Sequence, residues 1–335
     1  MHLSLLFVFA LPHVFALTLN IELLEEWQKY KEQFDKKYGL IEDLKRMKIW
    51  QKTKHLVEQH NDEYSRGLHS YTLGMNHMAD MTQEELDQRS CVRMTPESIR
   101  RMEAETELFT PREGVLPPIA DQMDWRTNNG YVGHVYDQGR CGACWAFSVV
   151  GTLESQYYLY TQQKVNLSQQ NLIDCDTSSF GCDGGYPYMG FQYIRDNGGI
   201  NTFESYPYEA RDNVCRFKND DPDNVPVSAI SRIKEGSEFD LRNAVATVGP
   251  VSVLIQSRDW KFSAYRDGVY DNPNCGDTYL NHAVVVVGYG TENGTDYWII
   301  KNSWSDRWGQ NGFGKMARNR GNQCGIASSA LYPII

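Results

Sequence analysis

The chain has 335 residues, a hydrophobic fraction of 41% and a formal net charge of -10. This length suggests about two domains and is sufficient to bury a sizeable core. The acidic balance argues against a nucleic-acid partner, which would require a basic face on the protein.

The N-terminus carries the pattern of a secretory signal. Residues 3–11 form an apolar block, and Val14-Phe15-Ala16 provides short residues where a signal peptidase cuts. A buried N-terminal helix or a membrane anchor is the alternative, but the block is too short to span a bilayer. We therefore predict a signal peptide at 1–16 and entry into the secretory pathway.

The next hundred residues are mainly helical in pattern. Residues 22–65 predict amphipathic helices, because apolar side chains recur three and four positions apart among Lys, Glu and Gln. An extended piece is expected at 71–81, and residues 82–106 are again polar and helix-prone. Residues 107–118 contain three prolines and a glycine, a composition typical of linkers. We predict a domain boundary and a processing site in this linker.

The region after the linker changes from helix to strand. Helices are expected from Cys144 to about residue 200, including one at 169–174 with Ser168 as its N-cap. The expected strands follow, at 251–256, 283–287 and 297–301. A helical half followed by a β half, without regular alternation, predicts an α+β fold with two lobes. A site would be expected in the cleft between them.

Cys144 lies at the start of a predicted buried helix. The backbone N–H groups and dipole of a helix N-terminus favour an anion, so a thiol there ionises more readily than in water. The thiolate is the nucleophilic form of cysteine. All cysteines except Cys91 follow residue 140, and their odd number leaves at least one unpaired in an oxidising compartment. We therefore predict that Cys144 is a nucleophile.

A cysteine nucleophile needs a base, and histidine can take a proton near neutral pH. The region after the linker contains two histidines, His134 and His282. His134 lies on a glycine-rich loop and is interpreted as structural. His282 precedes the buried strand at 283–287 in the other lobe, which makes it the candidate base, although a histidine at such a position could also be an ordinary core residue.

Three further residues could complete this site. Asn302 ends the strand that follows His282 and could accept a hydrogen bond from one ring nitrogen. Trp304 could shield that hydrogen bond from water. Gln138 carries an amide donor that, with the backbone N–H of Cys144, could stabilise an oxyanion.

The cysteines could also serve in a redox pair or in a zinc site. Cys141 and Cys144 could form a thioredoxin-type redox pair, but an aromatic residue follows the motif and Cys182 offers Cys141 another partner. A zinc site built from these three and Cys175 would have spacing unlike that of known zinc ribbons. We therefore expect neither a metal nor a cofactor.

The chain resembles the papain-like cysteine proteases, and within them the cathepsin L group, which includes cathepsins S and K. The signature is Cys141-Gly142-Ala143-Cys144-Trp145, with Asn281-His282-Ala283 in the range of spacing known for this family and Lys301-Asn302-Ser303-Trp304 slightly beyond it. The run from Gly181 to Gly185 is similar to the family's substrate-cleft loop. The resemblance implies a papain-like fold with a helical left lobe and a β-barrel-like right lobe. It also implies a cysteine endopeptidase that hydrolyses peptide bonds through a thioester, with an active-site cleft between the lobes.

The resemblance assigns 17–116 to a helical inhibitory propeptide and 117–335 to the mature peptidase domain. The motif residues of such propeptides appear in altered form as Glu42, Arg46, Trp50, Thr53, Val57, Asn61, Gly74, Asn76, Met78 and Asp80. A zymogen is thus implied, with the propeptide along the cleft and cleavage between about Gly114 and Ile119. Acid activation is a further hypothesis, because protonation would alter the charge of His55, His60, His69 and His77.

The resemblance also implies disulfides and subsites. The implied pairs are Cys141–Cys182, Cys175–Cys215 and Cys275–Cys324, which leave Cys144 unpaired and Cys91 without a role. Gly184 and Gly185 would offer backbone hydrogen bonds to a substrate. The walls of the second subsite would be Tyr186, Pro187, Leu254, Leu280 and Ser329. These walls are apolar or small, with no acidic residue at the floor, so a bulky apolar residue is predicted at the second position before the scissile bond, P2.

Some expectations remain beyond the site itself. Ser305 replaces a usual glycine, which could shift the loop that carries Trp304. Asn293 and Asn166 head glycosylation sequons, and Asn293 is the better candidate because it lies in a glycine-containing turn. We expect a monomer in the lysosome or outside the cell, with protein and peptide substrates and cystatin-type inhibitors as partners. The alternative from another class is a proteolytically silent homologue that serves as a binding protein.

Overall fold

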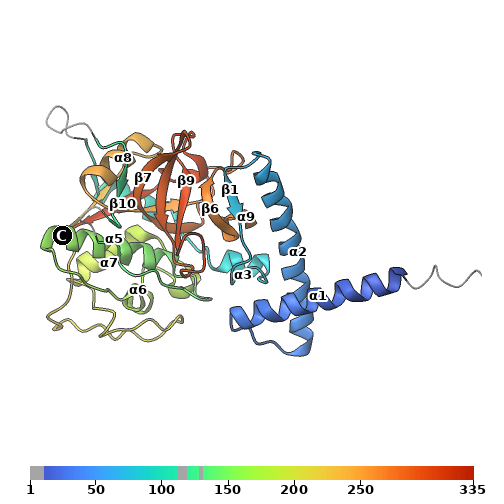
Figure 1. Ribbon diagram of the computed structural model, residues 1–335. Helices are drawn as coiled ribbons and strands as arrows, with labels where there is room; N and C mark the ends of the chain where they lie inside the picture. Colours follow the sequence, from blue (N-terminus) through green and yellow to red (C-terminus); the bar gives the residue numbers. More distant parts are fainter. Residues whose placement is uncertain (1–10, 112–118, 128–130) are drawn as a thin grey trace, which may run out of the picture.

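The computed structural model describes residues 11–111, 119–127 and 131–335, with side chains from residue 21 onward. Most of the predicted signal peptide and of the predicted cleavage region lies outside the described residues. Figure 1 shows a body with helices and a sheet, from which the two long N-terminal helices project to one side. Among the described residues, no helix has the combination of length and apolar character needed to cross a bilayer.

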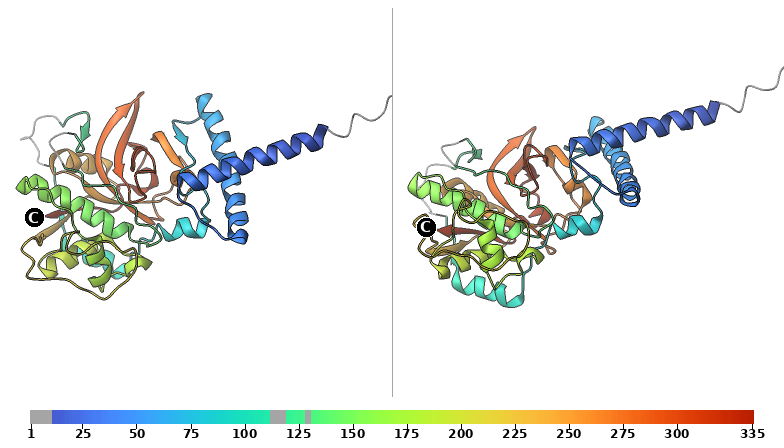
Figure 2. Two further views of the ribbon diagram at one scale, coloured as in Figure 1. Left: turned by 60° about the horizontal axis from the view of Figure 1, so that its bottom comes forward. Right: turned by 90° about the horizontal axis from the view of Figure 1, so that it is seen from below.

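The predicted propeptide is helical at its start and irregular at its end. Its elements are α1 (Leu11–Gln33), α2 (Leu40–Ser65), β1 (Tyr71–Leu73), α3 (Gln83–Gln88), α4 (Pro96–Glu105) and β2 (Glu107–Leu108). The helices predicted within 22–65 are confirmed. The helix-prone stretch at 82–106 is interrupted by extended chain between α3 and α4, which the sequence did not predict. Figure 2 shows α1 extending away from the body in both views.

A small core holds α1 and α2 together. Trp27 and Tyr30 of α1 pack against Trp50 of α2, and all three are buried. The Asp80 carboxylate is buried beside this core, where it accepts hydrogen bonds from Tyr38 at 2.6 Å and from the Lys36 ammonium at 3.1 Å. Burial of a carboxylate is costly unless it is paired. These contacts therefore hold the chain around Asp80, which follows α2, against the loop between α1 and α2.

The helical lobe is organised around one buried helix. Its elements are α5 (Cys144–Thr161), α6 (Gln169–Cys175), the 3-10 helix η1 (Gly181–Asp183) and α7 (Pro187–Asn197). The predicted N-cap is confirmed, since Ser168 accepts a hydrogen bond from the backbone N–H of Asn171 at 2.9 Å. α5 is buried from Cys144 to Gln156 because it lies between α7 on one side and the strands β5 and β7 on the other.

The other lobe is built on a sheet. Its remaining elements are β3 (Met123–Asp124), β4 (Ala229–Arg232), α8 (Glu238–Thr247), β5 (Val251–Ile255), α9 (Trp260–Ser263), β6 (Tyr265–Tyr270), β7 (His282–Glu292), β8 (Thr295–Lys301), β9 (Phe313–Ala317), the 3-10 helix η2 (Gln323–Gly325) and β10 (Ala330–Ile334). The three predicted strands correspond to β5, β7 and β8, which are neighbours in the order β8-β7-β5. The full order is β1-β6-β9-β8-β7-β5-β10-β4-β2, and β3 pairs with β7. The pairing is an open path, so hydrogen bonds among the described strands do not close the barrel-like lobe.

The predicted propeptide supplies both ends of this sheet. β1 pairs antiparallel with β6, with Tyr71 opposite Gly268, and β2 pairs parallel with β4, with Glu107 opposite Ser231. Covering an edge strand satisfies backbone groups that would otherwise be free to pair with another chain. The N-terminal segment is therefore part of the fold of the β lobe.

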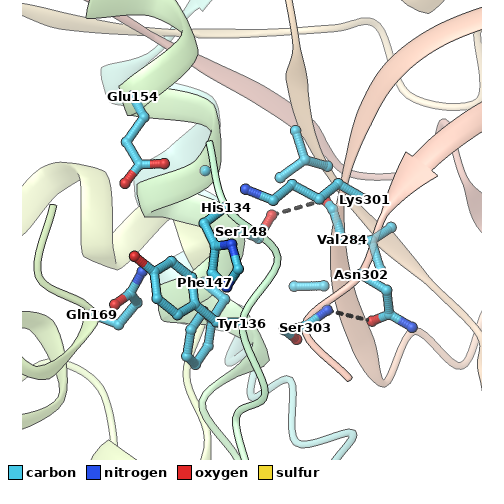
Figure 3. Close-up of a pocket in the computed structure, with 13 residues that line it drawn as sticks. His134, Tyr136, Phe147, Ser148, Glu154, Gln169, Val284, Lys301, Asn302 and Ser303 are labelled. Carbon is cyan, nitrogen blue, oxygen red and sulfur yellow. Dashed lines mark hydrogen bonds between the residues drawn. The ribbon is translucent and has the colours of Figure 1, made fainter. Parts of the chain in front are cut away.

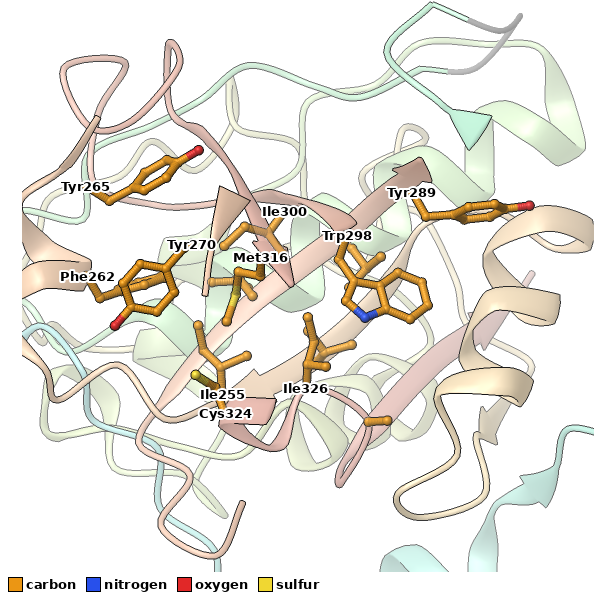
Figure 4. Packing of buried hydrophobic residues seen from close by; sticks show 14 of the residues in the cluster. Ile255, Phe262, Tyr265, Tyr270, Tyr289, Trp298, Ile300, Met316, Cys324 and Ile326 are labelled. Carbon is orange, nitrogen blue, oxygen red and sulfur yellow. The ribbon is translucent and has the colours of Figure 1, made fainter. Parts of the chain in front are cut away.

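The hydrophobic core of the β lobe leads to the same conclusion. Figure 4 shows Phe262, Trp298, Ile300 and Met316 packed together between the strands. The same buried cluster also contains residues of the N-terminal segment, namely Val57, Tyr71, Leu73 and Met78. Release of that segment would expose apolar surface on both partners, which hydrophobic burial opposes.

Candidate active site

His282 and Asn302 are brought together by two adjacent strands. His282 is the first residue of β7 and Asn302 follows the last residue of β8, and these strands pair antiparallel. Nε2 of His282 lies 2.8 Å from Oδ1 of Asn302, so the imidazole donates this hydrogen bond from Nε2. Nδ1 makes no hydrogen bond to the described residues. The arrangement fixes the ring and leaves one nitrogen available for proton transfer.

Trp304 covers this pair. Its ring centroid lies 4.6 Å from that of His282, and its side chain is 2% exposed. Water is thereby kept from the hydrogen bond between His282 and Asn302, which strengthens it in the low-dielectric surroundings.

Cys144 begins α5 and is completely buried. Burial raises the pKa of its thiol to about 12, although hydrogen bonding from the backbone at Ala283 and Cys91 opposes the shift. Burial also lowers the pKa of His282 to about 4, against the opposing effect of the hydrogen bond that the ring donates to Asn302. In this form of the protein, both groups are therefore neutral near neutral pH.

The extended chain between α3 and α4 lies beside Cys144 and crosses the cleft. The backbone N–H of Gly185 donates to the carbonyl of Cys91 at 3.2 Å, and Arg93 N–H donates to the carbonyl of Gly185 at 2.9 Å. Val92 N–H donates to the carbonyl of Asn281 at 3.0 Å in the other lobe. The segment 89–93, which we call the blocking segment, is thus tied to both sides of the cleft.

Gln138 has its side-chain groups fully used. Its Nε2 donates to the carbonyl oxygens of Cys141 at 2.8 Å and of Arg89 at 2.9 Å, and its Oε1 accepts from Ser303 Oγ at 2.7 Å. The contact from Ser303 fixes the orientation of the amide. One donor hydrogen therefore points at a carbonyl oxygen of the blocking segment.

A pocket of about 620 Å³ lies beside the Gly184-Gly185 loop. Tyr186, Leu280 and Ser329 line it as predicted, together with Met94 and Met102 of the N-terminal segment. The Tyr186 hydroxyl lies 3.1 Å from Ser329 Oγ, which fixes one wall. The pocket thus combines apolar walls with methionine side chains from the segment that runs through the cleft.

Two residues predicted for this pocket do not line it. Leu254 is 1% exposed and packs in the core of the helical lobe, and Pro187 starts α7, where it is buried. Three acidic residues that the sequence did not suggest, Glu103, Glu235 and Asp277, also line the pocket, and all three are exposed to solvent. The apolar walls therefore have an acidic rim.

A second cavity of about 20 Å³ lies between the lobes, and Asn302 is one of the residues that line it (Figure 3). Glu154 of α5 and Lys301 of β8 line it, and neither was singled out from the sequence. Burial raises the pKa of Glu154 to about 7 and lowers the pKa of Lys301, while each charge favours the charged form of the other. The position of Glu154, an acidic residue in a helix that is otherwise apolar and buried, was the sequence signal that could have revealed this pair of buried charged residues.

Comparisons with known proteins identify the family. Residues 119–334 match the papain family of cysteine proteases, and residues 27–86 match the cathepsin propeptide inhibitor domain. The chain belongs to the papain family of cysteine proteases. It is 42% identical to cathepsin K of Mus musculus, over 96% of this chain and 97% of that protein. It is also 42% identical to cathepsin L of Sarcophaga peregrina, over 97% of this chain and 98% of that protein.

Solved structures agree with this assignment. Digestive procathepsin L2 from the larval midgut of Tenebrio molitor is 38% identical, with a TM-score of 0.86, and the match covers 93% of this chain and all of that one. Procathepsin L3 from the same source gives a TM-score of 0.83 at 37% identity, covering 93% of this chain and 99% of that one. The papain-like α+β fold is confirmed, and the N-terminal segment is a papain-family propeptide.

The disulfides of this papain-family chain lie around the cleft and in each lobe. The structure contains Cys141–Cys182, Cys175–Cys215 and Cys275–Cys324, which are the pairs that the resemblance implied. The first of these joins the start of α5 to the loop that carries Gly184 and Gly185. Among the described residues, Cys91 and Cys144 are free.

The two sequons differ in their surroundings. Asn293 lies exposed in the turn between β7 and β8. Asn166 is half-buried, and its amide donates to Glu204 at 3.2 Å and accepts from the Tyr131 hydroxyl at 3.3 Å. A glycan on Asn293 would meet solvent, whereas one on Asn166 would break these contacts.

Ser305 does adopt a conformation that favours glycine, with φ of 67°. The neighbouring Trp304 nevertheless stays over His282. Ser305 Oγ donates to the Asp306 carboxylate at 2.8 Å and accepts from Arg307 N–H at 3.3 Å, and these contacts offset part of the strain. The loop is therefore strained at one residue but not displaced.

Replacing Ser305 by glycine should stabilise the protein slightly without changing catalysis. A non-glycine residue in the left-handed conformation costs roughly 1–2 kcal/mol. Glycine avoids this cost but loses additional backbone entropy on folding, worth about 0.5–1 kcal/mol. We expect Ser305→Gly to raise the free energy of unfolding by less than about 1 kcal/mol in urea titrations and to keep kcat/KM within about twofold. Ser305→Ala, the control, keeps the strain and loses the Oγ contacts, so it should destabilise. A large gain in turnover for the glycine variant would instead show that Trp304 is misplaced in the natural sequence.

Proposed function

We propose that this chain is the zymogen of a cysteine endopeptidase in which Cys144 is the nucleophile and His282 its proton-transfer partner. One observation carries the proposal. His282 Nε2 lies 2.8 Å from Asn302 Oδ1, and the backbone of Ala283, the residue after His282 in β7, lies at the Cys144 sulfur. Cys144 and His282 thus come from different lobes and meet at the cleft, as a nucleophile and base must.

The reaction uses each residue in turn. The Cys144 thiolate attacks the peptide carbonyl, and the oxyanion accepts hydrogen bonds from Gln138 Nε2 and from the backbone N–H of Cys144. His282, as imidazolium, gives its proton to the leaving amine and then activates the water that hydrolyses the thioester. Asn302 keeps the ring oriented through both proton transfers, and Trp304 keeps water off that contact.

The blocking segment explains why the proform does not digest itself at this point. A substrate of the proposed enzyme has its P2 residue before the carbonyl that is attacked. From the blocking segment towards α4 the order is reversed: the carbonyl of Arg89 meets Gln138 first, and Met94, which lines the pocket, comes later in the chain. The backbone polarity is therefore opposite to that of a substrate, and burial also keeps Cys144 as a thiol.

The pocket of Tyr186, Leu280 and Ser329 is proposed to bind the P2 side chain. Its volume and apolar walls favour a bulky apolar residue, and the propeptide already places methionine side chains there. The Gly184-Gly185 loop would hold the substrate backbone, as it now holds the blocking segment. The carboxylates of Glu235 and Asp277 remain in water at the rim, where their influence is screened.

The proposed function also implies how the chain is processed and where it acts. We propose a signal peptide at 1–16, a propeptide at 17–116 and a mature monomeric endopeptidase at 117–335, with activity in the lysosome or outside the cell. Protein and peptide substrates, and inhibitors of the cystatin type, would compete for the cleft that the propeptide now fills. Asn293 is the proposed glycosylation site.

Removal of the Cys144 thiol tests the catalytic assignment. Cys144→Ala should abolish hydrolysis of a fluorogenic peptide and leave a proform that stays intact at acid pH, because no acyl-enzyme can form. Active wild-type enzyme added in trans should still cleave this proform, which shows that it is folded. Cys91→Ala, the matched control, should retain activity after maturation. Peptide hydrolysis by Cys144→Ala would refute the role of Cys144.

The P2 proposal predicts a selective loss. Leu280→Ala should lower kcat/KM for substrates with Leu or Phe at P2 by roughly tenfold, because about 1–2 kcal/mol of apolar contact is lost. Substrates with Arg at P2 should change little. Tyr279→Ala is the control, since Tyr279 is the exposed neighbour outside the pocket. An equal loss for both variants, or a wild-type preference for Arg at P2, would contradict the assignment.

Acid should weaken the contact between propeptide and peptidase domain through His77. This ring is buried, 3.8 Å from the Asp137 carboxylate that also pairs with Arg89 at 2.5 Å. Burial lowers the pKa of His77 from 6.5 to about 4, with Arg89, Lys36 and Arg307 adding to the shift and Asp137 opposing it. Between these two pH values the released propeptide binds a proton that the docked form does not, so docking is weaker at pH 4 than at pH 6.5.

We expect the blocking segment of the Cys144→Ala proform to become more sensitive to an added protease as pH falls through this window. The rate at which the added protease cleaves the proform is divided by its rate on an unfolded substrate at the same pH. His77→Asn should flatten the profile, because its side chain does not titrate. Identical profiles for His77→Asn and its parent would show that other groups carry the pH dependence.

A further inference from the structure

The blocking segment brings a second free thiol to the cleft. The catalytic scheme uses Cys144 and leaves Cys91 without a role. Both are free, and every other cysteine of the described chain is in a disulfide. The position of Cys91 therefore decides what a thiol in the propeptide can do.

Cys91 is held against the start of α5. Its carbonyl accepts from Gly185 N–H at 3.2 Å, and the next residue donates from its backbone to the carbonyl of Asn281. A Cβ added to Gly142 would come within 2.8 Å of the Cβ of Cys91. Gly142 is two residues before Cys144, and the backbone of Cys91 itself faces the Cys144 sulfur. The two cysteines are thus neighbours across the interface between propeptide and peptidase domain.

We propose that Cys91 and Cys144 form a disulfide in the proform when a disulfide oxidant such as oxidised glutathione is present, and that this bond seals the nucleophile. The Cys91 thiol now donates to the carbonyl of Gln88 at 3.1 Å. Thiol hydrogen bonds are weak, so this contact does little to oppose the rotation of Cys91 about its Cα–Cβ bond that the proposed disulfide requires.

The difference in exposure of the two thiols sets the order of the steps. Cys91 is partly exposed, whereas Cys144 is completely buried and cannot meet an oxidant first. The Cys91 thiolate attacks oxidised glutathione, forming a mixed disulfide and releasing one reduced glutathione. The Cys144 sulfur then attacks the Cys91 sulfur, which forms the new disulfide and releases the second reduced glutathione. The two protons lost by the protein thiols end on the two released glutathione thiolates, and an excess of free thiol reverses both steps.

The bond would add a redox condition to activation. Cleavage of the linker would not free a propeptide that remains covalently attached to the nucleophile, even at acid pH. Disulfides persist in the secretory pathway, so the proform would stay latent until it reaches a compartment with free thiols. Formation of the bond depends only on geometry, and its effect on activity rests on the proposed function.

Peptide mapping tests the bond directly. The wild-type proform is incubated at about pH 8 with oxidised glutathione, its remaining thiols are alkylated, and it is digested without reductant. Mass spectrometry should find the peptides of Cys91 and Cys144 linked, and reduction should separate them. Cys91→Ser and Cys91→Ala should give no such species. Free thiols at both positions, or a glutathione adduct on Cys144 that is equally abundant in all variants, would overturn the proposal.

Processing tests the consequence. After oxidation and transfer to acid pH, the wild-type proform should stay unprocessed until a reductant is added, whereas Cys91→Ser should mature without it. Equal maturation of both in the absence of reductant would contradict the seal. If the linked peptides are found but neither protein hydrolyses peptides after reduction, the proposed function fails while the disulfide stands.

Discussion

The burial of Cys144 and His282 beneath the blocking segment is the constraint on which the rest of the structure depends. An ion pair of thiolate and imidazolium would have to be taken out of water, and the enclosed site instead favours the neutral thiol and neutral ring. The same cover places a backbone carbonyl on Gln138. On the proposed assignment, latency in this papain-family chain has two parts, since the cleft is filled and Cys144 and His282 are held in their unreactive protonation states.

The propeptide can maintain this cover because it is built into the peptidase fold at several distant points. It supplies a strand at each end of the sheet and side chains to the core of the β lobe, while Asn76 donates from its amide to the carbonyl of Ser263 at 2.7 Å. These apolar and backbone contacts do not titrate. The contact between His77 and Asp137 does titrate, and we propose that acid loosens this region beside the cleft while the anchors on the β lobe remain.

The parts that could be predicted from sequence are those in which pattern and position are local. Cys144 at a helix start and His282 at the head of a buried strand could be found because helix and strand periodicity identify them. The extended chain around Cys91 escaped detection, since its conformation is imposed by Gly185 and Asn281, far along the chain. β1 lies within the extended piece expected at 71–81, whereas the two residues of β2 carry too little pattern to be recognised. Leu254, which stays a prediction for the second subsite, lies on a strand beside the cleft and is buried in the core of the helical lobe.

The opposed shifts of the two catalytic pKa values also imply how the proform opens. Burial raises the pKa of Cys144 and lowers that of His282. Where the blocking segment supplies part of that burial, linkage requires that the ionised pair bind the segment more weakly than the neutral pair does. Release of the segment and ionisation of Cys144 and His282 are then two descriptions of one equilibrium. If Cys144 is the nucleophile, as we propose, movement of residues 89–93 away from the cleft would also favour its ionisation, without a separate activating step.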